Sequence, residues 1–294
     1  MQRRDPDRSG FVTLGRVRLR VWEWGDEDAP AVICVHGAHD HGRMFDGLGP
    51  ALARMGYRVV APDVRGHGDS DRISSGHLWH MAALDLCLLA RHLGPPVGMV
   101  GHSFGGGQAM FTAGVWPELV RWVVNLDGLG PPEGDFGGFD LAEGCANSLA
   151  AIERVLFSAP RLYPSLEDMV ERRRRVNTRL PEDWVRHLVR HGARQVEGGF
   201  AWKTDPMFNV GLPDDFGPEY LEAENSMISC PLLVLTGSEP DTWSELTPEQ
   251  VERRLAPLRT ARHRVVAEAG HYVHIEQPES VLDAIAGFVA EVGA

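Results

Sequence analysis

The sequence predicts an α/β fold built on a doubly wound, mostly parallel sheet. Five short apolar segments, each ending in a glycine or a polar turn, alternate with longer segments of helical character. Near-continuous apolar runs are typical of strands that are buried on both faces of a parallel sheet. A chain of 294 residues has room for one such domain with an insertion. The alternating order of strands and helices favours a sheet with helices on both faces.

The first expected element is an edge hairpin over residues 10–26, where Val17, Leu19 and Val21 alternate with arginines. The five buried strands are expected at 31–37, 57–63, 97–103, 120–128 and 230–237. Helices are expected between them at 44–55, 80–92 and 106–115. A further strand, 263–268, precedes a terminal helix at 278–292.

The alternation of strands and helices lapses between residues 131 and 227. A stretch rich in glycine and proline is followed there by helical patterns at 141–157, 165–176 and 181–191, without a convincing strand. We therefore expect an α/β core over 1–130 and 228–294, with a helical cap over 131–227.

The expected cap carries two features that bear on a ligand. Its aromatic residues predict a moderately apolar substrate group; they are Phe136, Phe139, Trp184, Phe200, Trp202 and Phe208. The basic run 172–175 is interpreted as a solvated helix face rather than as an anion site.

Composition excludes several classes of protein. The formal net charge of −12 argues against a nucleic-acid footprint. No window is apolar enough for a membrane span, and the first residues show no secretory signal. The four scattered cysteines suit buried thiols in a reducing compartment. We expect a cytoplasmic protein whose partner is a small molecule, with a homodimer left open.

A single serine among glycines stands between a strand and a helix. The stretch Gly101-His102-Ser103-Phe104-Gly105 has the G-x-S-x-G pattern in the strand-turn-helix context that this motif requires. So tight a turn strains the serine backbone and requires neighbours without side chains two positions away on either side. The pattern predicts that Ser103 is an exposed nucleophile at the start of a helix, whose N-terminal dipole favours developing negative charge.

A serine hydroxyl needs a base to remove its proton. His271 is the candidate, because it lies in a loop between the strand at 263–268 and the terminal helix. We expect His274 to be structural and His102 to pack or hydrogen-bond locally.

The base in turn needs a carboxylate to orient it. Asp241 follows the strand that precedes the histidine's strand, and Asp127 ends the strand before that. Both keep the chain order serine, acid, histidine. Asp241 is preferred, Asp127 stays a competitor and Glu239 ranks third.

An acyl-transfer site also needs donors for an oxyanion. The backbone amide of Phe104 follows the nucleophile, and that of Ala38 follows the strand ending at His36-Gly37. His39 and His41 lie nearby, but no carboxylate or cysteine stands at a supporting spacing, so neither a metal nor another cofactor is expected.

Together these segments resemble the α/β-hydrolase fold family. "HGAHDHG" looks like its oxyanion loop, "DVRGHGDSD" like the turn after its fourth strand, "GHSFGG" like its nucleophile elbow and "GHYVHIEQPE" like its histidine loop. The resemblance implies an eight-stranded sheet with a cap after strand six. "DGLGPP" and "HIEQP" are similar to a serine-hydrolase-like, esterase or lipase subgroup.

Two details separate this chain from other patterns in the family. Members that hydrolyse epoxides or carbon–halogen bonds carry aspartate in the elbow, where this chain has Ser103. After strand seven the spacing from Gly237 to Asp241 is one residue longer than the common G-x-x-D, which keeps Asp127 in contention.

The predicted function is hydrolysis of a carboxylic ester, lactone or thioester by a Ser-His-Asp triad through an acyl-enzyme. Two alternatives remain. One is a carbon–carbon bond hydrolase with the same triad, and the other is a non-catalytic ligand receptor on the same scaffold.

Overall fold

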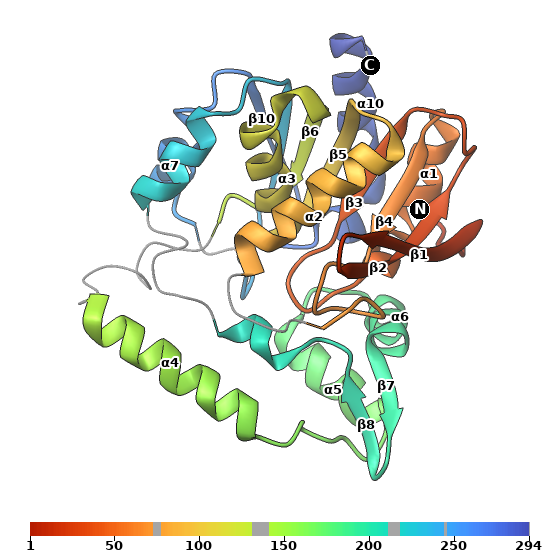
Figure 1. Ribbon diagram of the computed structural model, residues 1–294. Coiled ribbons are helices and arrows are strands. Elements are labelled where there is room, and N and C mark those ends of the chain that lie inside the picture. The colour runs from red at the N-terminus through yellow and green to blue at the C-terminus, as the bar shows by residue number, and fades with distance from the viewer. Residues whose placement is uncertain (73–77, 131–140, 211–217, 244–245, 294) are drawn as a thin grey trace.

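Eight strands form one sheet in the computed structural model, which describes residues 1–72, 78–130, 141–210, 218–243 and 246–293 (Figure 1). The strand order is β1-β2-β4-β3-β5-β6-β9-β10. The strands are β1 (Arg8–Leu14), β2 (Val17–Trp24), β3 (Ala31–Val35), β4 (Arg58–Pro62), β5 (Val97–His102), β6 (Val120–Leu126), β9 (Leu232–Gly237) and β10 (Ala261–Val266).

The sheet is antiparallel at one edge and parallel elsewhere. β1 and β2 form the expected hairpin, and β2 pairs antiparallel with β4. From β4 to β10 every neighbouring pair is parallel. β5 and β6 run side by side with Gly101 opposite Asn125 and His102 opposite Leu126, so the residues that follow these two strands emerge together. The predicted doubly wound sheet is confirmed.

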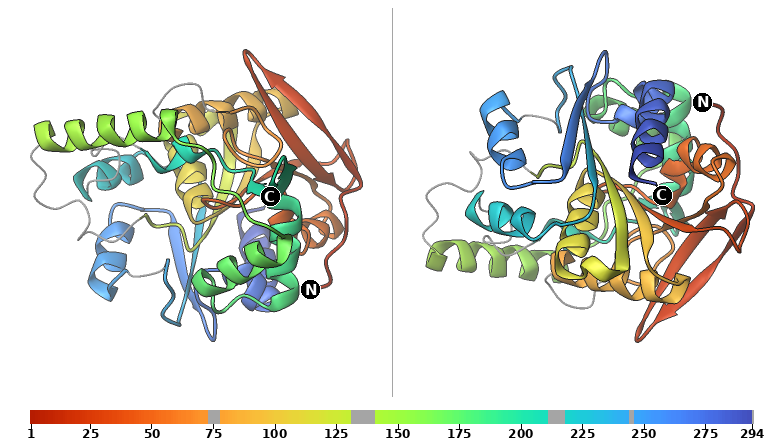
Figure 2. Two further views of the ribbon diagram at one scale, coloured as in Figure 1. Left: turned by 90° about the horizontal axis from the view of Figure 1, so that it is seen from below. Right: turned by 90° about the horizontal axis from the view of Figure 1, so that it is seen from above.

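Helices cover both faces of the sheet, and alternating strand side chains face them. Val32 and Cys34 belong to one apolar cluster, whereas Ile33 and Val35 belong to the other. Figure 2 shows α1 and α10 on one side of the sheet and α2 and α3 on the other. The core helices are α1 (Leu48–Arg54), α2 (Leu78–Leu93), α3 (Phe104–Val115), α8 (Pro248–Leu255), α9 (Val273–Glu276) and α10 (Pro278–Val292), with short 3₁₀ turns η1 (Gly42–Phe45) and η2 (Pro117–Leu119).

Most of the described residues between β6 and β9 form a separate layer beyond the carboxyl ends of the parallel strands (Figure 1). The elements of this layer are α4 (Leu141–Phe157), α5 (Leu166–Val176), α6 (Glu182–Gly192), β7 (Ala193–Val196), β8 (Gly199–Trp202) and η4 (Pro206–Asn209). α7 (Pro218–Ser226) instead lies beside α3 of the core. Met169 of α5 and Val185 of α6 are fully buried in the same apolar cluster as Met44 and Phe45 of η1. This contact fastens the layer to the core.

The three predicted helices of this layer are present, but the expectation that it lacks strands is wrong. β7 and β8 form an antiparallel hairpin with Val196 paired to Gly199, so Glu197 and Gly198 make a two-residue turn. Gly198 and Gly199 have φ values of 84° and 145°, which side-chain-bearing residues rarely adopt. Phe136 and Phe139 lie outside the described residues. Of the helices in the described residues, none is long and apolar enough to cross a membrane.

α3 packs so closely on the sheet that neither Gly105 of the helix nor Gly101 of β5 has room for a side chain. A Cβ on Gly105 would clash with the carbonyl oxygens of Val35 and His36, and a Cβ on Gly101 would clash with the carbonyl oxygen of Gly105. Backbone atoms at both places cannot move without shifting β3 or α3. The two glycines of the G-x-S-x-G pattern therefore fix the distance between strand and helix.

Replacing Gly105 by alanine is expected to lower the free energy of unfolding by about 1–3 kcal/mol, the usual cost of overpacking. The matched control is Gly287→Ala in α10, where an added Cβ meets nothing within 4 Å. That change should instead stabilise by about 0.5–1 kcal/mol, because alanine is the better helix former. Denaturant unfolding measures both, and equal effects of the two substitutions would contradict the packing argument.

Candidate active site

Ser103 occupies the sharp turn between β5 and α3. Its backbone has φ 53° and ψ −122°, a conformation that costs energy for any residue with a side chain. The turn is held from both sides, since the Ser103 amide donates to the Leu126 carbonyl at 2.9 Å and the Gly106 amide donates to the Ser103 carbonyl at 2.8 Å. The side chain is half-buried and lines a pocket. The strained turn expected from the sequence is present at this serine.

His271 lies in the loop between β10 and α9 and reaches the same pocket. Its Nδ1 lies 2.7 Å from Oδ2 of Asp127, and both side chains are nearly buried, at 6% and 5% exposed. A carboxylate oxygen only accepts, so Nδ1 carries the hydrogen of this bond. In the neutral imidazole, Nε2 is then left unprotonated and able to accept a proton.

Asp127 is aimed by the turn that follows β6. Its own φ is 52°, and its amide donates to the Leu235 carbonyl at 2.7 Å. The fully buried Asn125 side chain closes the turn, accepting from the Gly128 amide at 2.7 Å and donating to the Gly128 carbonyl at 2.9 Å. Sequence reasoning did not single out Asn125, although an asparagine two residues before a strand-end aspartate is a recognisable turn signal.

The preference for Asp241 over Asp127 as the partner of the imidazole disagrees with this geometry. Oδ2 of Asp241 accepts a 3.3 Å hydrogen bond from the backbone amide of His271, and its Oδ1 accepts a 3.4 Å bond from the Trp243 amide. Asp241 follows β9 by several residues and turns toward the backbone of the histidine loop, whereas Asp127 directly follows β6, the strand next to β5. Glu239 bonds to its neighbour Ser238, with its side-chain oxygen 2.9 Å from the hydroxyl.

His102 and His274 are buried next to the loop that carries His271. His102 donates from Nε2 to the His271 carbonyl at 2.9 Å, and its ring lies 4.9 Å from that of His274. Burial lowers the pKa of His102 well below its usual value, and the neighbouring His271 and His274 side chains add to this effect. His274 stacks on Phe45 with ring centroids 5.7 Å apart. Both imidazoles are therefore neutral packing groups, in the local roles that the sequence led us to expect.

Two backbone amides lie beside Ser103. Phe104 is the first residue of α3, where amides have no partner within the helix. Ala38 lines the pocket, and a Cβ built on the preceding Gly37 would lie 3.2 Å from the Cβ of Ser103. Within the described part of the chain, neither the Phe104 nor the Ala38 amide donates a hydrogen bond. Two free donors beside the Ser103 hydroxyl are the kind of groups that bind an oxyanion.

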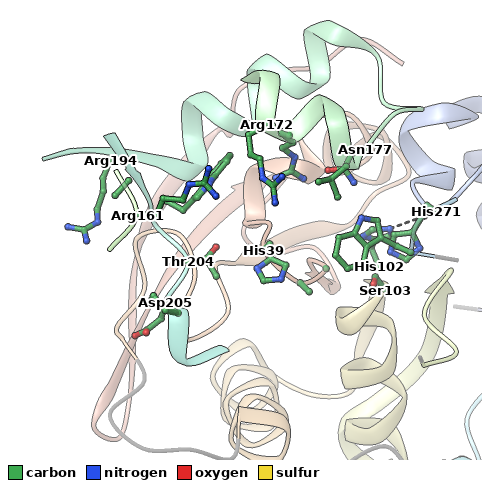
Figure 3. Close-up of a pocket in the computed structure, with 18 of the residues that line it drawn as sticks. His39, His102, Ser103, Arg161, Arg172, Asn177, Arg194, Thr204, Asp205 and His271 are labelled. Carbon is green, nitrogen blue, oxygen red and sulfur yellow. Dashed lines mark hydrogen bonds between the residues drawn. The ribbon is translucent and has the colours of Figure 1, made fainter. Parts of the chain in front are cut away.

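The pocket that holds Ser103 and His271 has a volume of about 410 Å³ (Figure 3). It lies between the core and the layer formed by α4 to η4, which is called the upper layer from here on. The core supplies Gly37 to His39, His102 and Ser103, and the upper layer supplies residues of α5, β7 and β8. Of the aromatic residues singled out in the sequence, Trp202 lines the pocket. Trp184 instead packs edge-on against His187 in the interior.

A buried polar network joins α5 to two loops of the core. The Arg173 guanidinium pairs with Asp40, and the Tyr272 hydroxyl donates to the other Asp40 oxygen at 3.0 Å. Burial lowers the pKa of Arg173, but the adjacent Asp40 carboxylate more than offsets this, and the net shift is upward. The network links the oxyanion-side loop, the histidine loop and the upper layer. No local sequence pattern indicates this network, because its members are far apart in the chain.

Among the described residues, no group of three histidine, cysteine, aspartate or glutamate side chains is placed to hold a metal ion. His41, considered as a ligand from the sequence, has Nε2 3.0 Å from the Leu188 carbonyl.

Comparison with known proteins identifies the family. The family model described as alpha/beta hydrolase fold matches residues 30–278, and the chain belongs to that family. The resemblance noted in the sequence is thereby confirmed, and the protein is an α/β-hydrolase enzyme.

Its relatives are hydrolases of several kinds. The chain is 28% identical over 276 residues to the sn-1-specific diacylglycerol lipase ABHD11 of Mus musculus, covering 90% of this chain and 83% of that one. It is 27% identical over 286 residues to the 2-(acetamidomethylene)succinate hydrolase of Mesorhizobium japonicum, covering 95% and 94%. Its fold matches a thioesterase domain from the curacin biosynthetic pathway with a TM-score of 0.81, at 22% identity and with 95% and 98% coverage.

The buried His274 predicts how stability depends on pH. Burial lowers its pKa from 6.5 to about 3, and neither ring nitrogen has a hydrogen-bond partner among the described residues. The unfolded chain therefore binds a proton that the folded chain refuses, so the stability present above pH 6.5 is lost progressively as the pH falls toward 3.

Replacing His274 by phenylalanine should flatten this loss of stability without lowering stability at pH 7, because the apolar ring needs no hydrogen bond. Urea unfolding of both proteins between pH 7 and pH 4 measures the effect. Parallel curves for His274→Phe and the parent would contradict it.

Proposed function

We propose that the protein hydrolyses a carboxylic ester or a related acyl compound, such as a lactone or thioester, through an acyl-enzyme on Ser103. The observation that carries the proposal is the 2.7 Å contact between His271 Nδ1 and Asp127 Oδ2. His271 lines the same pocket as Ser103, whose backbone is held at φ 53°. Relatives that are named as a lipase and as a hydrolase of a succinate derivative support the reaction class.

In the first step, the Ser103 oxygen attacks the substrate carbonyl while Nε2 of His271 takes its proton. Asp127 holds the Nδ1 hydrogen and stabilises the imidazolium as it forms. The carbonyl oxygen, now negatively charged, accepts hydrogen bonds from the amides of Ala38 and Phe104. The imidazolium then protonates the leaving group, and the carbon–oxygen or carbon–sulfur bond breaks.

In the second step, water attacks the acyl-enzyme. His271 removes a proton from the water and returns it to Ser103, which releases the acid and restores the starting state. We further propose that residues 1–130 and 228–294 form the catalytic core and that 131–227 form a cap over it. The pocket walls supplied by α5, β7 and β8 support this division.

Replacing Ser103 by alanine is expected to lower kcat for a chromogenic short-chain ester by about 10³-fold or more, the usual effect of losing a nucleophile. A fluorophosphonate should label the parent protein and not this variant. The matched control is Ser158→Ala, an exposed serine just after α4 whose hydroxyl donates to the Val155 carbonyl, and it should leave both readouts unchanged. Labelling that persists in Ser103→Ala would contradict the mechanism, and no labelling of the parent would favour a non-catalytic receptor.

A second pair of variants distinguishes the roles of Asp127 and Asp241. Asp127→Asn should lower kcat by about 10³–10⁴-fold, because an asparagine amide no longer fixes the imidazole tautomer. Asp241→Asn should lower it by less than about tenfold, since only hydrogen bonds from backbone amides are lost. Steady-state kinetics on one ester compares them, and a larger loss for Asp241→Asn would assign the role to that residue instead.

A further inference from the structure

Five arginines line the pocket that holds Ser103: Arg72, Arg161, Arg172, Arg173 and Arg194. Arg173 is buried and neutralised by Asp40. For the other four, the described part of the chain contains no acidic side chain paired with the guanidinium. This local excess of positive charge stands in a chain whose net charge is −12.

The basic run in α5 divides between two faces of the helix. Arg172, Arg173, Val176 and Asn177 line the pocket, since residues spaced by three and four positions share a helix face. Arg174 and Arg175 point elsewhere, at 3.8 Å from Glu182 and 3.6 Å from Glu171. The interpretation of the run as a solvated face is therefore wrong for Arg173, which is buried, whereas Arg172 is exposed and also borders the pocket.

The unpaired guanidiniums extend along the pocket away from the serine. Figure 3 shows Ser103 and His271 at one end, Arg172 and Asn177 above His39, and Arg161 and Arg194 toward the other end. Arg161 lies 5.2 Å from the centre of the Tyr163 ring, a contact that leaves its hydrogen-bond donors available.

One carboxylate, that of Asp205, also borders the pocket. It caps η4 by accepting from the Met207 amide at 3.0 Å. Thr204 and Asn177 add neutral polar groups. A single acid does not balance four guanidiniums, so the cavity is electropositive at the end away from Ser103.

Arg172 and Arg161 lie along the cavity between Ser103 and its far end, whereas the Arg194 guanidinium points away from them (Figure 3). Like charges along one cavity repel one another, and a bound anion relieves this repulsion. The planar fork of arginine binds carboxylates and phosphates through two parallel hydrogen bonds. An acidic protein repels anions at long range, so a positive cavity selects for them only locally. A neutral ester would accept hydrogen bonds from these groups but would lack the charge that makes such bonds about twice as strong.

We propose that the substrate is an anionic acyl compound, with a carboxylate or phosphate group bound by Arg172 and Arg161 while its scissile carbonyl lies at Ser103. This inference rests on the proposed function for the scissile end. The binding of the anion itself does not depend on catalysis.

The first experiment compares esters that differ only in charge. Mono-4-nitrophenyl glutarate is matched by 4-nitrophenyl pentanoate, which places the charge on the acyl side. 3-Acetoxybenzoate is matched by 3-acetoxybenzamide, which places it on the leaving-group side. After subtraction of the non-enzymatic rate, kcat/KM should favour the anionic member of at least one pair by about tenfold or more, as expected for charge-assisted hydrogen bonds.

The second experiment removes the charges. Arg172→Gln and Arg161→Gln should each lower the ratio of anionic to neutral kcat/KM by about tenfold, the loss of one charge-assisted contact. Arg174→Gln is the matched control on the outer face of the same helix and should leave both rates unchanged. Inorganic phosphate and glutarate should inhibit competitively, and the smaller inhibition constant tells which anion the cluster prefers.

Binding without turnover separates the two proposals. Glutarate or phosphate titrated into Ser103→Ala by calorimetry should bind, and Arg172→Gln in that background should weaken binding about tenfold. Equal rates within both ester pairs, together with no binding of either anion, would overturn the anion inference and leave serine hydrolysis standing. Full ester turnover by Ser103→Ala would overturn the proposed mechanism, while binding of the anion would still support the arginine site.

Discussion

β5 and α3 are joined at Ser103 by a tight turn, and this turn positions the other groups of the site. Only Ser103 separates the last residue of β5 from the first residue of α3. The helix lies so close to β3 that there is no room for a Cβ at Gly105. The chain can make this turn only with Ser103 at φ 53°, a strained conformation that the surrounding hydrogen bonds maintain. The strain lifts the hydroxyl toward the pocket and turns the free amide of Phe104 to the same side.

Sheet order then brings the remaining groups to this turn. β6 is the direct neighbour of β5, so the turn after β6 reaches the serine, and Gly128 lies against the Ser103 carbonyl so closely that a Cβ there would clash with it. The same turn points Asp127 at His271. The long loop from β10 brings His271 back across β9, and His102 holds the backbone of that loop in place. Residues 103, 127 and 271 thus meet because of strand order, not because of closeness in sequence.

The sequence predicts the parts of the site that local patterns determine. Glycine spacing, buried strands and the order of motifs were sufficient for the sheet, the strained serine and the histidine loop. Strand position alone does not choose the acid, because Asp127 and Asp241 both follow strands at their carboxyl ends. The Asn125 turn directs Asp127 toward the imidazole, and Asn125 is the one signal in the sequence that could have favoured it. The two faces of the arginine run could have been found, since Met169 and Val176 at helical spacing mark the inner face.

We propose that Ser103, His271 and Asp127 act as one unit with the amides of Ala38 and Phe104. A crystal structure of the protein after reaction with a phosphonate ester would show all five groups at once. We expect a covalent bond from Ser103 Oγ to phosphorus, a phosphoryl oxygen within hydrogen-bonding distance of both amides, and His271 still bonded to Asp127. An adduct on another residue, or a phosphoryl oxygen turned away from both amides, would contradict it.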